Sequence, residues 1–148
     1  MSKEDIVPVA QVREKVQRIL TETYGSVSID NDGDFFVKFG SAVVFVNVFE
    51  LNSGTTIVRS FAVMLRNVRL TPDVYRWVAT EGQHYFFGHS VVREGENGIG
   101  TIIFEHALLG DFLDADELRW AVIALGDSAD TLDDELQARF GGEKFVEG

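Results

Sequence analysis

The run Ala42–Leu51 (AVVFVNVFEL) constrains the fold of this chain most strongly, because it is apolar at both odd and even positions. A strand with one face in water alternates apolar and polar side chains. A strand that is apolar at both odd and even positions is typical of the centre of a sheet. Such a strand is either covered on both faces, or covered on one face with an apolar surface left on the other. The run therefore predicts a sheet with two apolar faces.

Further strands are predicted on both sides of this run. Before it, Val27–Ile29 and Phe35–Phe39 flank a turn at Asn31–Gly33. After it, Thr55–Val68 predicts a long strand. One face of this strand is expected to carry Ile57, Phe61, Val63 and Leu65. These segments form a first group of antiparallel strands.

A second group of strands follows later in the chain. Tyr85–Phe87 and Ser90–Arg93 are predicted to form one strand, Glu94–Gly98 a turn, and Thr101–Leu109 the paired strand. Because short turns join the strands within each group, the economical arrangement is a single antiparallel sheet.

Three helices are predicted from spacing and from capping residues. The first helix has apolar residues at the spacing of an amphipathic helix, and it is expected to end at Gly25. Thr71 and Pro72 start a short second helix. Asp114 and Glu117 form a capping box at the start of a long last helix.

The last helix has an apolar seam that is predicted to pack on the sheet. The seam is Leu118, Val122, Leu125, Ala129, Leu132, Leu136 and Phe140. Gly126 lies beside it and is expected to kink or interrupt the helix. Acidic residues cover the remaining surface, and Asp133 is expected to lie among them in water.

The order of elements is a helix, three or four antiparallel strands, a short helix, two strands and a long helix, which predicts an α+β fold with a single antiparallel sheet and helices on one face. Residues 1–142 are expected to form one domain, and residues 143–148 a flexible tail. If the helices cover one face of the sheet, the surplus of strand aromatics leaves apolar surface for a partner or a second subunit, so a homodimer is expected.

Composition excludes several classes of protein. The 148 residues are 45% hydrophobic and 25% charged, which argues against wholesale disorder. Cysteine is absent, which excludes disulfides and thiolate metal sites. A net charge of −11 argues against nucleic acid and anionic membranes as partners. The N-terminus has no long apolar run, so no signal peptide is predicted and the cytoplasm is the expected location.

No motif in the sequence predicts a catalytic or metal site. Asp30–Asp34 resembles the start of a calcium loop, but its glycine is at the wrong position and the flanks are predicted strands. The histidines have no metal-binding spacing. We therefore expect no cofactor, no metal and no enzyme. The alternative left open is a ligand-binding or enzymatic site that uses His89 and His106 with nearby carboxylates.

Several strings resemble the YbjN-like family. They are Asp30–Phe39 (DNDGDFFVKF), Val43–Leu51 (VVFVNVFEL), Val63–Leu65 and Leu109–Leu118. The closing segment, Ala129–Gly142, resembles actinobacterial members, which are grouped with type III secretion chaperones as TY-Chap peptide-binding chaperone-like domains. The resemblance covers residues 8–142. It implies a small, acidic, dimeric α-β-β-β-α-β-β-α domain that binds an extended client. The family is also described as a sensory-transduction regulator, which would make the chain an adaptor.

Together, these observations predict a non-enzymatic module that binds an extended segment of a client protein, by strand addition or by side-chain capture. The apolar candidates lie on the first helix and the central strands, and three arginines could select acidic segments. The candidate residues are Val9, Val12, Val16, Phe45, Phe49, Arg59, Phe61, Val63, Arg66 and Arg76.

Overall fold

Six strands form one antiparallel sheet in the computed structural model, which describes residues 8–146. The strands are β1 (Ser28–Ile29), β2 (Phe35–Phe39), β3 (Ala42–Glu50), β4 (Thr56–Arg69), β5 (His89–Glu94) and β6 (Ile99–Leu109). Their order across the sheet is β1-β2-β3-β4-β6-β5. The prediction of an α+β fold with a single antiparallel sheet is confirmed.

The segment before β5 differs from the prediction. Tyr85–Phe87 is not part of a strand but lies in a loop after the short helix η2 (Glu81–Gln83). The Tyr85 ring turns onto Phe104, with the ring centroids 4.9 Å apart. Gly88 then has a φ of +91°, which ends the irregular segment before β5 begins. Aromatic composition alone gave no sign of this turn.

The described part of the chain has three α-helices, α1 (Val9–Tyr24), α2 (Pro72–Ala79) and α3 (Ala115–Phe140). The end of α1 before Gly25 and the starts of α2 and α3 after Thr71 and Asp114 agree with the prediction. The Thr71 hydroxyl accepts a hydrogen bond from the Val74 N–H at 3.4 Å, at the start of α2. Asp114 accepts from the N–H groups of Asp116 and Glu117 at 2.8 and 3.3 Å, at the start of α3. These caps satisfy amide groups that the first helical turn leaves without partners.

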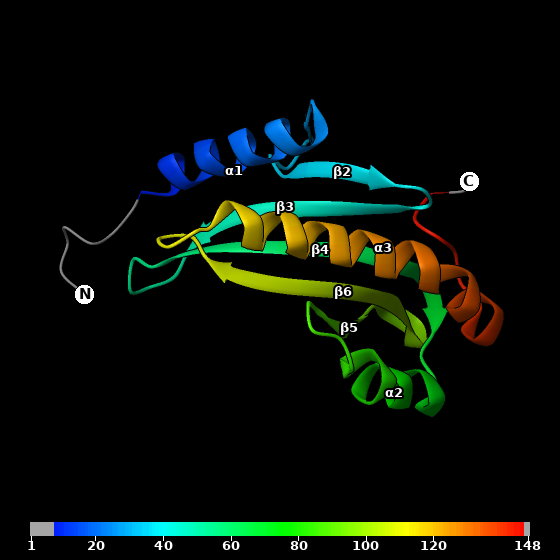
Figure 1. Ribbon diagram of the computed structural model, residues 1–148. Coiled ribbons are helices and arrows are strands. Elements are labelled where there is room, and N and C mark those ends of the chain that lie inside the picture. The colour runs from blue at the N-terminus through cyan, green and yellow to red at the C-terminus, as the bar shows by residue number, and fades with distance from the viewer. Residues whose placement is uncertain (1–7, 147–148) are drawn as a thin grey trace.

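Helices α1 and α3 lie on one face of the sheet, which we call the covered face. Figure 1 shows α3 lying over β3 and β4, with α1 beside β2 and α2 beyond β5. The buried core lies between the helices and this face. Its largest fully buried side chains include Val12, Val16 and Leu20 of α1, Phe35, Val44 and Phe104 of the sheet, and Leu118, Leu125 and Leu136 of α3.

Gly126 does not interrupt α3, which is continuous from Ala115 to Phe140, so the predicted kink is wrong. The glycine instead allows the helix to approach the sheet closely. A Cβ at position 126 would lie 2.4 to 2.6 Å from three ring atoms of Phe39. Its small size therefore serves the packing of α3 on β2 and not a break in the helix.

Asp133 is buried, with 2% of its surface exposed, so its predicted place on the solvated face of α3 is wrong. The Ser41 hydroxyl, in the β2–β3 turn, donates a hydrogen bond to Asp133 Oδ2. Ser41 also donates from its backbone N–H to Asp130 Oδ1 at 2.9 Å. The last turns of α3 thus pack against the β2–β3 turn, and this contact removes Asp133 from water.

The register of β4 changes along its length. Between Val63 and Leu65 the pairing with β6 shifts, so that the two residues oppose the neighbours Ile103 and Ile102. The irregularity turns Leu65 toward the core, where it is fully buried. The prediction that Leu65 shares a face with Phe61 and Val63 is therefore wrong.

Residues 143–146, the first part of the expected flexible tail, contact the sheet, and residues 147–148 lie outside the described residues. Glu143 forms an antiparallel bridge with Arg66 of β4. The Val146 N–H donates to the Ser41 carbonyl at 3.2 Å. The Phe145 ring packs edge-on against Phe45, with ring centroids 5.6 Å apart. We call residues 143–146 the C-terminal segment.

Candidate functional site

The face of the sheet opposite α1 and α3, which we call the open face, has no helix of residues 8–146 packed on it (Figure 1). Successive side chains of a strand point to opposite faces, so the register assigns each residue to one face. The open face carries Phe36 and Lys38 of β2, Phe45 and Phe49 of β3, Arg59, Phe61 and Val63 of β4, Ile103 and Glu105 of β6, and His89, Val91 and Arg93 of β5. Ile103 is buried but is absent from the core cluster under the helices.

A row of aromatic rings crosses the open face. Phe36, Phe45 and Phe61 are directly opposite one another on β2, β3 and β4. The ring centroids of Phe36 and Phe45 are 5.9 Å apart, and those of Phe45 and Phe61 are 5.1 Å apart in a stacked arrangement. All three side chains are half-buried. The row is a flat apolar surface that can pack against the side chains of another segment.

A charged cluster continues this row toward β5. Arg59 Nε and Nη2 lie 3.0 and 2.9 Å from Glu105 Oε2. The Arg59 guanidinium also lies over the Phe61 ring, 4.9 Å from its centroid. His89 Nε2 lies 3.6 Å from Glu105 Oε1. Arg59 is thus held in place by a carboxylate and by an aromatic ring at the centre of the face.

Three further cations on or beside the open face are not neutralised. Lys38, Arg66 and Arg93 form no ion pair with any residue in the described part of the chain. The chain as a whole carries a net charge of −11. The open face therefore has a locally positive character on an acidic protein, and it favours acidic groups in whatever it contacts.

The structure brings together only part of the predicted site. Phe45, Phe49, Arg59, Phe61 and Val63 share the open face. Phe49 is the most accessible of the predicted aromatics, at 39% exposure. Arg66 lies at the end of β4, beside these residues.

The remaining predicted residues lie elsewhere. Val12 and Val16 are buried in the core under α1, so the structure does not present them on a surface. Val9 is half-buried at the start of the same helix. Arg76 is exposed on α2, beyond the β5 edge (Figure 1). The amphipathic pattern of α1 could not separate a core stripe from a binding stripe, because both have the same period.

Phe36, Lys38 and Arg93 are open-face residues that sequence reasoning missed. Phe35 and Phe36 are adjacent aromatics, and only one of them can point to the core. The register shows that Phe35 points to the core, and its side chain is 1% exposed. Alternation counted outward from Phe45 through the short hairpin would have placed Phe36 on the open face.

His89 and His106 do not form a joint site. His89 is on the open face near Glu105, whereas His106 is on the covered face, opposite Ser60. The Gly88 N–H donates to His106 Nδ1 at 3.1 Å, which requires that nitrogen to be unprotonated. Burial lowers the pKa of His106, and nearby His89 lowers it further. Within residues 8–146, no three His, Asp or Glu side chains converge to hold a metal ion.

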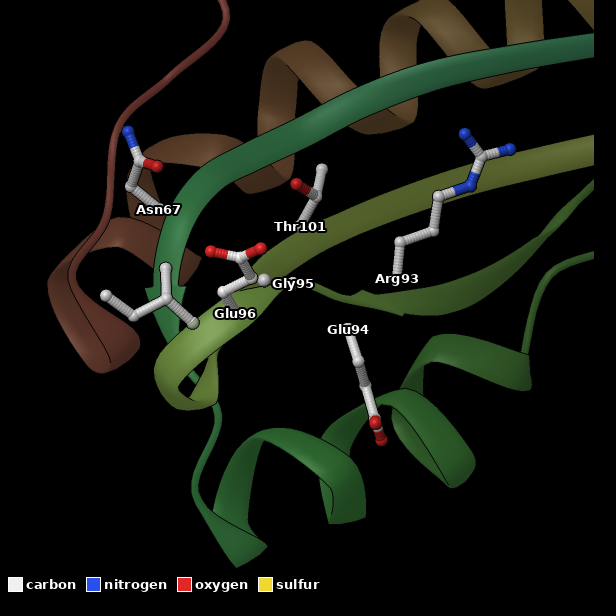
Figure 2. Close-up of a pocket in the computed structure, with 8 residues that line it drawn as sticks. Asn67, Arg93, Glu94, Gly95, Glu96 and Thr101 are labelled. Atoms are coloured by element: carbon white, nitrogen blue, oxygen red, sulfur yellow. The ribbon is translucent and has the colours of Figure 1, made fainter.

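A polar hollow of about 410 Å³ lies at the end of the β5–β6 hairpin (Figure 2). Arg93, Glu96 and Thr101 line it, and Asn67 of β4 forms one wall. Asn67 has a φ of +54°, and its side-chain amide donates to Glu143 Oε2 at 3.1 Å. The hollow therefore adjoins the C-terminal segment, and its lining shows no convergent catalytic arrangement.

Comparison with known families identifies the family of this domain. A family model described as "T3SS (YopN, CesT) and YbjN peptide-binding chaperone 1" (TY-Chap1) matches residues 10–148. The chain belongs to this family. No curated protein matches its sequence. Among residues 8–146, no helix of this TY-Chap1 domain is long and apolar enough to cross a membrane.

Solved structures share the fold of this TY-Chap1 domain at low sequence identity. YbjN from E. coli superposes with a TM-score of 0.57 at 10% identity, over 86% of this chain and 92% of YbjN. ExsC, solved in the ExsC–ExsE complex, matches with a TM-score of 0.51 at 20% identity, over 82% and 92%. The Yersinia pestis type III secretion chaperone SycH, solved with a stable fragment of YscM2, matches with a TM-score of 0.52 at 14% identity, over 84% and 99%. The fold is that of type III secretion chaperones.

Proposed function

We propose that this TY-Chap1 domain is a non-enzymatic binding module that holds an extended segment of a client protein on its open face. The observation that carries the proposal is the aromatic row of Phe36, Phe45 and Phe61 on a face that no described helix covers. Contiguous exposed apolar surface on a folded domain marks an interaction site.

The shape of the face supports an extended client over a small ligand. The rings of the open face lie side by side and half-buried, and they do not surround an enclosed cavity. Small-molecule sites are concave, with polar groups that converge on the ligand. A segment in extended conformation places alternate side chains on one side, and these can lie across such a row.

The charge of the face supports a client with acidic residues near its apolar ones. Lys38 and Arg93 lie at opposite sides of the open face, and Arg59 lies at its centre. Cationic groups at the rim of an apolar patch steer association more than they add affinity. Two of the structural neighbours were solved with a protein partner, ExsE and a YscM2 fragment respectively, which is consistent with a protein segment as the partner here.

Binding to a permanently unfolded protein tests the proposal. Fluorescently labelled, reduced and carboxymethylated α-lactalbumin is titrated with the wild-type chain and with Phe61→Ala. We expect binding by the wild type and at least tenfold weaker binding by Phe61→Ala, which corresponds to about 1.4 kcal/mol. Phe86→Ala is the matched control, because Phe86 is fully exposed in the loop before β5 and does not belong to the open face.

Phe49→Ala provides a second variant in case Phe61→Ala perturbs folding. Phe49 is more exposed and makes no ring contact with the described aromatic residues, so its removal leaves the stack of Phe45 and Phe61 intact. Equal affinity of the wild type, Phe61→Ala and Phe49→Ala for the probe would overturn the proposal.

We further propose that the domain forms a homodimer that leaves the open face accessible. Exposed apolar side chains are also present away from that face, at Tyr75 of α2 and at Phe86. Light scattering should give a particle of twice the 16.5 kDa chain mass, and Phe61→Ala should retain it. A dimer that dissociates in Phe61→Ala would instead assign the open face to the second copy of the chain.

A further inference from the structure

The end of β4 has a strand edge that β3 does not cover. The register of β3 and β4 pairs Val44 with Ala62, which places Ala42, the first residue of β3, opposite Met64. β4 continues to Arg69, so its last residues extend beyond β3. Backbone groups at such an edge can pair with another extended segment.

The C-terminal segment takes this edge. The Arg66 N–H donates to the Glu143 carbonyl, and the Glu143 N–H donates to the Arg66 carbonyl, both at 2.8 Å. Farther along the segment, the Val146 N–H donates to the Ser41 carbonyl at 3.2 Å. These backbone contacts are those of strand addition, formed here within one chain.

Two side chains of the segment contact specific groups. The Phe145 ring lies between the Phe45 ring, 5.6 Å from centroid to centroid, and the Arg66 guanidinium, 5.4 Å from the ring centroid. The Glu143 carboxylate accepts a hydrogen bond from the Asn67 amide at 3.1 Å. Phe145 thereby extends the aromatic row of the open face by one ring.

The segment is held mainly by groups at the surface, together with an ion pair between Asp134 of α3 and Lys144, whose side chain is 16% exposed. Arg66, Asn67 and Glu143 are all exposed, and Phe145 is only half-buried. Segments held by few buried contacts open at a small free-energy cost compared with the core. The C-terminal segment can therefore leave this edge without unfolding the sheet.

We propose that the end of β4 is a peptide-binding slot that selects an acidic residue followed two positions later by an aromatic one, and that Glu143 and Phe145 occupy it as an internal ligand that a client displaces. This inference rests on the proposed function and specifies which client segments the domain takes. The partner is a protein segment with this acidic-x-aromatic pattern in extended conformation.

Gly142 offers a way to release the segment without changing the slot or the residues that fill it. It has a φ of +84°, and a Cβ there would lie 2.7 Å from the Arg66 carbonyl oxygen. Gly142→Ala should therefore push the segment away from β4. Gly33→Ala is the matched control, because Gly33 has a φ of +86° and no atom within 4 Å of the added Cβ.

The test uses full-length chains and a fluorescein-labelled peptide with the sequence of residues 141–146, GGEKFV. An internal segment competes at an effective concentration in the millimolar range. We expect the wild type and Gly33→Ala to bind the peptide weakly, and Gly142→Ala to bind it at least tenfold more tightly. Phe145→Ala in the full chain should release the segment as well, which provides a second variant.

The specificity of the slot is tested with the peptide GGEKAV, which lacks the aromatic side chain. Its affinity for Gly142→Ala should be at least tenfold lower than that of GGEKFV. In NMR spectra of Gly142→Ala, the amide signals of Arg66 and Asn67 should shift when GGEKFV binds.

The outcomes separate this inference from the proposed function. Equal binding of GGEKFV to wild type, Gly33→Ala, Gly142→Ala and Phe145→Ala, or no binding to any of them, overturns the slot. The proposed function still stands in that case if unfolded α-lactalbumin binds in a manner that depends on Phe61. If neither probe binds any chain, both fail.

Discussion

The two faces of the sheet are similarly apolar but are used differently. On β3, Val44 and Val46 point to the covered face and are fully buried, whereas Phe49 points to the open face and is 39% exposed. The covered face meets α1 and α3 in a close-packed core. The open face has a flat row of rings and several cations. Apolar composition therefore indicates which strands are central, but not whether the chain itself covers both of their faces.

The two faces also differ in how closely they are packed. On the covered face, the packing leaves no room for one added carbon atom at position 126, because Gly126 allows the contact between α3 and the Phe39 ring. On the open face, the rings of Phe45 and Phe61 stack on each other, the Arg59 guanidinium lies over the Phe61 ring, and both rings are only half-buried. A surface of this kind accepts different side chains with little rearrangement, which suits a site for extended segments.

The largest expected difference between the faces is in stability. Leu125 on α3 is fully buried, so Leu125→Ala should lower the free energy of unfolding by about 2–5 kcal/mol. Phe49→Ala on the open face should lower it by less than about 1 kcal/mol, since Phe49 is already exposed. Urea melts at several protein concentrations measure both and separate unfolding from dimer dissociation. Similar losses for the two variants would remove the distinction between the faces.

A smaller effect is expected at Gly126. Alanine is the better helix former by about 1 kcal/mol, but its Cβ would collide with the Phe39 ring. We expect Gly126→Ala to lower the free energy of unfolding by about 1–3 kcal/mol, the usual cost of overpacking. Phe39→Leu in the same chain should recover part of this loss, and a double-mutant cycle of urea melts measures the recovery. An unchanged or higher stability of Gly126→Ala would mean that α3 does not approach β2 this closely.

The sequence was sufficient to predict most of the fold. Periodicity and capping residues located α1, α2 and α3, since the signals at Thr71 and Asp114 are local. The run that is apolar at both odd and even positions predicted that β3 lies at the centre of the sheet. The register shift near Leu65 was not predictable in this way, because it depends on the pairing of β4 with β6, which is distant in sequence.

The candidate site was predicted only in part, for the same reason. Phe45, Phe49 and Phe61 followed from strand alternation, which fixes the face of a side chain. Val12 and Val16 lie instead in the core. An apolar stripe on a helix indicates that this side of the helix is buried, but it does not indicate whether the sheet or a bound partner buries it. The position of Phe145 on the sheet depends on the turn at Gly141 and Gly142, and the composition of the last residues does not predict this position.

The contribution of Asp133, at the edge of the covered face, to the free energy of unfolding should depend on pH. Burial raises its pKa above the ordinary 3.8, although the hydrogen bond from Ser41 and the charge of Lys144 oppose this. The folded state therefore holds a proton on Asp133 more tightly than the unfolded state does. The resulting stabilisation is complete below pH 3.8 and is lost as the pH rises through the folded-state pKa.

Asp133→Asn measures this contribution, since the amide oxygen can still accept from Ser41. Relative to Asp133→Asn, the wild type should become more stable as the pH is lowered from 7 toward 4. Urea melts of both chains across this range provide the comparison. A constant difference between them would show that the Asp133 carboxyl titrates alike in the folded and unfolded states.

The smallest effect is expected at His106, where the sign is opposite. Burial lowers its folded-state pKa below 6.5, so its stabilising contribution is present above pH 6.5 and is lost as the pH falls through the folded-state pKa. His106→Gln keeps an acceptor for the Gly88 N–H and does not titrate. Between pH 7.5 and 5.5, the wild type should lose stability relative to His106→Gln in thermal melts. Parallel pH profiles would contradict the assignment.

Site-specific photo-crosslinking tests the central claim that the open face, and not another apolar surface, holds the client. Benzoyl-phenylalanine replaces Phe49 or Phe61 on the open face in separate chains, and Phe86 or Trp120 in control chains. Phe86 and Trp120 are both well exposed, in the loop before β5 and on α3 respectively. With unfolded α-lactalbumin as the client, we predict strong crosslinks from positions 49 and 61 and weak ones from positions 86 and 120. Crosslinks that are equal at all four positions, or stronger at the controls, would contradict the account.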